Sequence, residues 1–150
     1  MIQIAPEPFD SPDATELMAE LRRELDARYG ADLEPGQKPA AEDVTMVLIA
    51  REDDGRPLGC GALRSLGEPV VEIKRMYVRP DARGRGVGVA ILAALEREAV
   101  GLGFKVVRLE TGPLQPEAIG LYARAGYREI PCFGAYAAGQ ASRCFERRLA

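Results

Sequence analysis

A glycine-rich turn that leads into a long helix constrains this sequence more than any other feature. The turn reads Arg83-Gly84-Arg85-Gly86-Val87-Gly88, and apolar residues at helical spacing follow it from Gly88 to Gly101. Glycines at alternate positions let the backbone approach a ligand closely and point successive N–H groups into one concavity. The start of the helix adds unpaired N–H donors and the positive end of its dipole. The turn therefore predicts a phosphate or pyrophosphate site, to which Arg83 and Arg85 contribute positive charge.

The spacing of these glycines excludes two nucleotide-binding motifs. A Walker A loop needs G-x-x-x-x-G-K-[ST], which the chain does not contain. A dinucleotide-binding turn needs G-x-G-x-x-G after a first parallel strand, but counting from Gly84 places Val89 at the third glycine. A plain tight turn, or a nucleotide site of another kind, stays open on the evidence of the turn alone.

The strand before the turn carries a break in its alternation. In Val70 to Arg79, apolar residues fall at positions 71 and 73 and then at 76 and 78. One extra residue in the pleat would produce this shift, so we predict a β-bulge between Lys74 and Met76. A strand buried on both faces is the alternative.

The remaining pattern predicts an α+β fold. With 150 residues the chain is expected to form one domain, residues 1–150. We predict a mixed, mostly antiparallel twisted sheet of six to seven strands, flanked by helices on both faces. The strands are expected at 1–5, 45–51, 58–65, 70–79, 105–110, 127–131 and 142–149, and the helices at 14–29, 88–101 and 117–125. The connection 31–42 is long enough to border a substrate entrance.

Composition excludes several functional classes. The chain has no histidine, which removes Ser-His-Asp and Cys-His catalysis and His-ligated metal sites, and we expect no metal. A net charge of −3 disfavours nucleic acid as a partner. The start MIQIAPEPFD lacks the segments of a secretion signal, and no apolar run approaches the ~18 residues that span a bilayer. We expect a cytoplasmic protein in which Cys60, Cys132 and Cys144 are reduced thiols.

Two motifs in register resemble the GNAT superfamily of N-acetyltransferases, in its small single-domain bacterial form. The pattern R-x-x-G-x-G at Arg83, Gly86 and Gly88, after Tyr77-Val78-Arg79-Pro80, is similar to the family's acetyl-CoA signature. The run Glu117 to Arg128 (EAIGLYARAGYR) resembles its second motif. The similarity extends from about Thr45 to Leu149.

This resemblance implies a site for acetyl-CoA. The residues Arg83, Gly84, Arg85, Gly86, Val87 and Gly88 would hold the pyrophosphate. The bulged strand would splay from the strand at 105–110, and the backbone of Met76, Tyr77 and Val78 would pair with the pantetheine arm. Gln115 stands where the family often has Asn, in contact with the same cofactor.

The resemblance also implies a mechanism with two catalytic residues. An amine with a pKa of ~10.4 is almost fully protonated at pH 7, so its attack benefits from a base. Glu72 matches the catalytic Glu of histone-acetylating members, although a solvated Glu paired with an Arg across the sheet would look the same. Tyr122 matches the Tyr that protonates the departing thiolate, and the context L-Y-x-x-x-G-Y favours this role over that of a core residue.

The resulting hypothesis is an acetyl-CoA-dependent N-acetyltransferase that works by direct attack in a ternary complex. Its acceptor would be a primary amine of a small molecule, or a peptide, and a homodimer is common in such folds. A non-catalytic acyl-CoA-binding module that regulates or senses is the alternative. Tyr136 and Ser142 could line the acceptor site, but the pattern favours placing both on the surface.

Overall fold

The computed structural model describes residues 1–29, 44–112, 115–138 and 142–149 of the chain. Seven strands form one sheet in the order β1-β2-β3-β4-β5-β7-β6. Neighbouring strands are antiparallel except β4 and β5, which are parallel. The strands are β1 (Gln3–Pro6), β2 (Met46–Arg51), β3 (Pro57–Ser65), β4 (Val70–Val78), β5 (Val106–Thr111), β6 (Arg128–Ile130) and β7 (Arg143–Arg148). The predicted α+β class and mixed sheet are confirmed.

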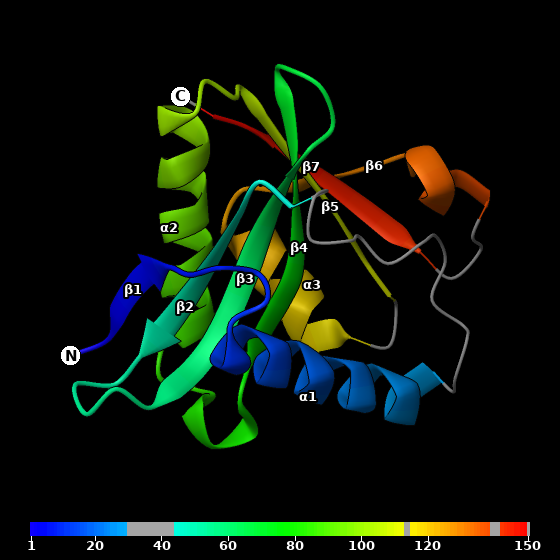
Figure 1. The fold of residues 1–150 in the computed structure, drawn as a ribbon. Coiled ribbons are helices and arrows are strands. Elements are labelled where there is room, and N and C mark those ends of the chain that lie inside the picture. The colour runs from blue at the N-terminus through cyan, green and yellow to red at the C-terminus, as the bar shows by residue number, and fades with distance from the viewer. Residues whose placement is uncertain (30–43, 113–114, 139–141, 150) are drawn as a thin grey trace.

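Helices cover both faces of this sheet, as predicted. The three helices are α1 (Pro12–Tyr29), α2 (Val87–Gly101) and α3 (Pro116–Arg124). In Figure 1, α1 crosses one face of the sheet, whereas α2 and α3 lie behind it. The Ser11 hydroxyl starts α1 by accepting a hydrogen bond from the Ala14 N–H at 3.1 Å.

Each face has its own apolar core, because the strands alternate their side chains between the two layers. On one face Leu17 and Leu21 of α1 pack against Val47 and Ile49 of β2. On the other face α2 and α3 pack against the sheet through a larger cluster. The sheet is therefore held between two layers, and its strand ends are available to form a site.

The predicted bulge is present in β4. Cys60 pairs with Tyr77 and Ala62 pairs with Lys74, so Arg75 and Met76 lie opposite Gly61 alone. Arg75 adopts a φ of 59°, and a Cβ on Gly61 would lie 2.8 Å from the Met76 sulfur. The alternative, a strand buried on both faces of the sheet, holds only for the stretch from Val71 to Ile73.

The predicted separation of the two central strands is also present. β4 pairs with β5 only through residues 70–73 and 106–109. Beyond that point β4 continues to Val78 and β5 to Thr111 without pairing to each other. Beyond Ile73, this edge of β4 has no paired strand among the described residues, so it can accept another extended chain.

The expectation of three reduced thiols is wrong for two of them. Cys132 and Cys144 form a disulfide with a Cα–Cα distance of 5.1 Å. Ile130 of β6 pairs with Cys144 of β7, which brings Cys132, two residues further along, next to its partner. Cys60 remains a free buried thiol, and burial raises its pKa to about 12. An odd cysteine count does not reveal a pair when the contact depends on strand register.

Two other expectations remain untested. The connection at 31–42 lies outside the described residues. No helix within the described ranges is long and apolar enough to cross a membrane. A cytoplasmic location stays a prediction. The disulfide contradicts the reduced cysteines that were one argument for it.

Candidate active site

A cavity of about 380 Å³ occupies the place where β4 and β5 separate. Its walls come from α1, β4, the turn before α2, the end of β5, and α3. The predicted site residues that line it are Glu72, Met76, Tyr77, Val78, Arg83, Gly84, Gly86, Val87, Gly88, Gln115 and Tyr122. The predicted catalytic and cofactor-binding residues therefore meet at one opening, with the exception of Arg85.

The glycine-rich turn forms an open cradle at one end of this cavity. Gly84 and Gly86 have φ angles of 80° and 78°, which L side chains rarely adopt. A Cβ added at either position would meet nothing within 4 Å, so the backbone faces open space. Gly86 is also the N-cap of α2, whose first N–H groups have no partner within the helix. These features suit an anionic group such as a pyrophosphate.

The two arginines of the turn are bound to glutamates. The Arg83 Nη2 lies 2.6 Å from Glu24 of α1, and its Nε donates to the Val78 carbonyl at 2.9 Å. Arg85 pairs with Glu52, and it does not line the cavity. Arg83 therefore fixes the turn against α1 and β4, whereas the placement of Arg85 does not match the predicted contact with the ligand.

Polar contacts also fix the end of β4 against α1. The Tyr77 hydroxyl donates to Glu20 at 3.1 Å, and Arg79 donates to the same carboxylate at 2.9 Å. Burial, followed by the hydrogen bond to Glu20, raises the pKa of Tyr77 to about 12. Because the Tyr77 side chain is bound to Glu20, Tyr77 can contact an extended ligand only through its backbone.

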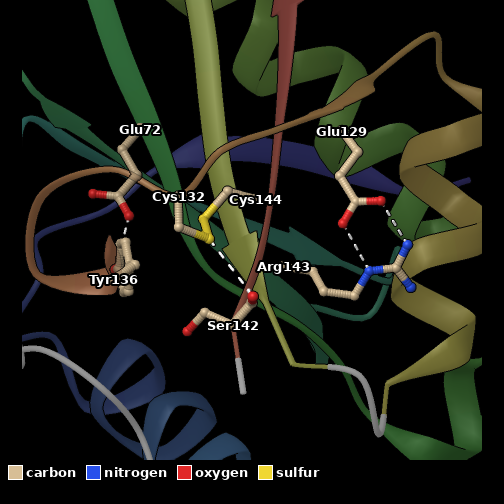
Figure 2. Close-up of a disulfide and its surroundings, with 7 residues drawn as sticks. All are labelled: Glu72, Glu129, Cys132, Tyr136, Ser142, Arg143 and Cys144. Carbon is tan, nitrogen blue, oxygen red and sulfur yellow. Dashed lines mark hydrogen bonds and ion pairs between the residues drawn. A yellow bond between two sulfur atoms is a disulfide. The ribbon is translucent and has the colours of Figure 1, made fainter. Parts of the chain in front are cut away.

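A chain of hydrogen bonds crosses the other end of the cavity. The Lys74 Nζ donates to the Tyr136 hydroxyl at 2.5 Å, and this hydroxyl donates to the Glu72 carboxylate at 2.8 Å. Figure 2 shows Tyr136 and Glu72 pointing toward each other beside the disulfide. Glu72 is only 1% exposed, and Arg64 on β3 lies 3.5 Å from its second oxygen. Glu72 is therefore buried and not solvated, but it does pair with an Arg across the sheet, as the alternative interpretation expects.

Tyr136 is buried, which corrects its expected place on the surface. It belongs to a short 3-10 helix, Gly134–Ala138, that follows the disulfide residue Cys132. Burial, and then the charge of Glu72, raise its pKa well above the ordinary value of a phenol. Burial lowers the pKa of Lys74, although Glu72 opposes this shift. The sequence gives no local signal for Tyr136, because 64 residues separate it from Glu72.

The end of β5 adds polar groups that the sequence analysis missed. Burial raises the pKa of the Glu110 carboxyl, and the nearby Ser142 and Lys74 oppose this shift. The buried Thr111 hydroxyl has no hydrogen-bond partner among the described residues. A carboxyl with a raised pKa inside a cleft is a common feature of acid–base sites.

Tyr122 enters the cavity from α3. It is 4% exposed, and its ring makes an edge contact with Tyr127 at 5.8 Å between centroids. Burial raises its pKa, so the phenol keeps its proton across the physiological range. The site thus holds a phenol that can donate a proton and a carboxylate that can accept one, both at the same opening.

Comparison with known proteins identifies this arrangement. Residues 7–127 match the sequence profile of the acetyltransferase (GNAT) family. The chain belongs to the GNAT acetyltransferase family. A curated GNAT relative named IAA acetyltransferase, from Azospirillum brasilense, is 35% identical over 140 residues, which cover 88% of this chain and 90% of that protein.

Solved GNAT structures share the whole fold. A crystal structure described as an acyl-CoA N-acyltransferase from Klebsiella pneumoniae superposes with a TM-score of 0.86 and 30% identity, over 100% of this chain and 99% of that one. A GNAT acetyltransferase from Elizabethkingia anophelis with acetyl-CoA bound superposes with a TM-score of 0.73 and 18% identity, over 99% and 98% of the chains. This protein is accordingly an N-acetyltransferase with the GNAT fold.

Proposed function

We propose that this N-acetyltransferase moves an acetyl group from acetyl-CoA to a primary amine of a small molecule or a peptide. The observation that carries the proposal is the opening between β4 and β5, which joins the Gly84–Gly88 cradle to Glu72 and Tyr122. When bound, acetyl-CoA supplies an activated acetyl thioester. Acetyl-CoA in the related Elizabethkingia anophelis structure supports this choice of donor.

The residues present suit that donor. Open space in front of Gly84 and Gly86 admits a pyrophosphate to the backbone N–H groups up to Gly88. The edge of β4 from Met76 to Val78 offers backbone groups to the pantetheine amides, with the Val78 carbonyl also accepting the hydrogen bond from Arg83. Gln115, at the N-cap of α3, lines the same cavity and presents an amide.

Glu72 acts as the general base in this proposal. Its carboxylate is nearly inaccessible and already accepts a hydrogen bond from Tyr136, so the amine proton reaches it through a water in the cavity. Lys74 and Tyr136 hold the carboxylate in one orientation. A positioned base of this kind contributes about 10²- to 10⁴-fold to the rate.

Direct attack by the amine fits the groups available. Cys60 does not line the cavity, and its raised pKa keeps it a thiol. The other two cysteines are held in the disulfide. With no histidine in the chain and no cysteine among the described residues that line the cavity, neither a thiol nor a histidine-activated hydroxyl is present there to carry the acetyl group.

Turnover of acetyl-CoA with a panel of primary amines tests this proposal, with release of the free thiol as the readout. Glu72→Gln should lower kcat by at least about 100-fold and leave acetyl-CoA affinity within about twofold. Glu146→Gln is the matched control, because Glu146 is a buried carboxylate of the same sheet that binds Arg108 and Arg128 outside the cavity. Binding of acetyl-CoA without acetylation of any amine would instead support a regulatory module.

A further inference from the structure

Arg75 presents an unusual charge to the cavity. The bulge places this residue at a φ of 59°, with its carbonyl accepting a bond from the Cys60 thiol at 3.3 Å. Its side chain lines the cavity, and its buried Nε has no hydrogen-bond partner among the described residues. Other half-buried arginines, such as Arg51 and Arg79, are bonded to carboxylates.

A second arginine reinforces this positive charge. Arg22 of α1 lines the same cavity, where its Nη1 lies 3.4 Å from Asp26. Burial, and then repulsion from Arg22, lower the pKa of Arg75, and no carboxylate is among the groups that oppose this shift. Arg22 and Arg75 therefore place two guanidinium groups of like charge on the wall of one cavity, and an anion bound there would offset the repulsion between them.

Negative charge lines the same cavity on the neighbouring strands. Glu72 of β4 and Glu110 of β5 both contribute carboxyl groups to its wall. Lys74 lies 3.8 Å from Glu72 and interacts with Arg75 as well, so the acidic and basic groups adjoin each other along β4. In a ligand that carries both an ammonium and an anionic group, the ammonium could pair with these carboxyl groups and the anion with the guanidinium groups.

We propose that the acceptor is an amine that also bears a carboxylate, in the manner of an amino acid, and that Arg75 with Arg22 binds this carboxylate. This inference rests on the proposed function, since it assigns the acceptor of that reaction. A guanidinium matches a carboxylate through two parallel hydrogen bonds, which fix orientation as well as position. Arg75 and Glu72 line one cavity from the same strand, so a ligand held at Arg75 by its carboxylate has its amine in the cavity that Glu72 lines.

The test compares L-amino acids with their carboxamides, which keep the amine and the side chain but lose the negative charge. The wild type should acetylate at least one amino acid with a kcat/KM about 10- to 100-fold above that of its carboxamide. Arg75→Gln should remove this preference by raising the KM for the acid by a similar factor, with little change for the carboxamide. Arg75→Lys keeps the charge without the bidentate geometry and should keep part of the preference.

Arg23→Gln is the matched control, since Arg23 is an exposed arginine beside Arg22 that does not line the cavity. Equal use of acids and carboxamides by the wild type would overturn the inference and leave the proposed function intact. If no amine is acetylated, the proposed function fails. The site is then tested by calorimetric titration of the same L-amino acids into protein saturated with CoA. Binding that Arg75→Gln abolishes would still support the carboxylate site, and absence of binding would overturn it.

Discussion

The Tyr122 hydroxyl is the group that we expect to donate a proton to the departing thiolate. It lines the cavity and keeps its proton, because burial raises its pKa. We expect Tyr122→Phe to lower kcat by about 10²-fold or more, with acetyl-CoA affinity nearly unchanged. Steady-state kinetics and calorimetry measure the two quantities.

Tyr127→Phe is the control for this variant. Tyr127 is also buried and contacts Tyr122, but its hydroxyl donates to Glu96 outside the cavity. Its loss should cost stability without a comparable loss of kcat. Equal kinetic effects in the two variants would contradict an acid role for Tyr122.

The Glu110 carboxyl ties stability to pH. Burial raises its pKa in the folded protein above the ordinary value of 4.5, which applies to the unfolded chain. Below pH 4.5 both states are protonated, and the buried carboxyl carries no charge. As the pH rises through the folded-state pKa the folded protein must ionise it, so this contribution to stability is lost. We expect Glu110→Gln to be increasingly more stable than the wild type as the pH rises above 4.5, by denaturant unfolding.

A carboxyl with the opposite shift serves as the control. Arg143 lowers the pKa of the exposed Glu129. Glu129→Gln should therefore be less stable than the wild type above pH 4.5, and this difference in the free energy of unfolding should disappear as the pH falls below 4.5. Parallel pH profiles for the two variants would show that burial does not dominate at Glu110.

At the scale of the elements, the turn before α2 depends on the absence of side chains. Gly86→Glu would place a bulky negative group at a φ of 78°, in front of the N–H groups of the cradle. We expect acetyl-CoA affinity to fall by at least about 100-fold in calorimetry, because two like charges would meet at the site.

Gly67→Glu separates this effect from backbone strain. Gly67 has a φ of 98° with open space around it, and it lies in the turn between β3 and β4 outside the cavity lining. Both variants therefore pay a similar conformational cost of about 1–2 kcal/mol. A similar loss of affinity in both would argue against the Gly84–Gly88 turn as the pyrophosphate site.

Local elements could be predicted from the sequence, and long-range contacts could not. The turn, the helix behind it and the bulge each leave a signal within a few residues, such as the shift of apolar positions from 73 to 76. The pairing of Cys132 with Cys144 and the bond from Tyr136 to Glu72 depend instead on the register of β6 and β7. The Arg75 Nε, which has no hydrogen-bond partner among the described residues, was missed because only the folded chain shows which arginines lie beside a carboxylate.

At the scale of the whole molecule, the disulfide joins the sheet to the active site. It closes the segment from Cys132 to Cys144 that carries Tyr136 to Glu72. A link across a loop of this length contributes about 3 kcal/mol to stability. Reduction should therefore lower the free energy of unfolding by about this amount and slow turnover, because Tyr136 is held less firmly.

Thiol titration gives an independent check on this bond. The unfolded protein should expose one thiol before reduction and three after it. A Cys132→Ser variant should show no further change of stability or rate when reductant is added. Three reactive thiols in the untreated protein would contradict the disulfide.

Among the described residues, β4 and β5 are paired at four positions. The sheet therefore has a four-stranded part, β1 to β4, and a three-stranded part, β5 to β7, which are joined by this short pairing. A molecule seated beyond this pairing touches both parts and binds only the folded chain. At a hundred times its Kd, such a molecule adds about 2.7 kcal/mol of stability. Acetyl-CoA would then stabilise the fold as well as react. A fall in its concentration would lower the free energy of unfolding before the enzyme stops turning over.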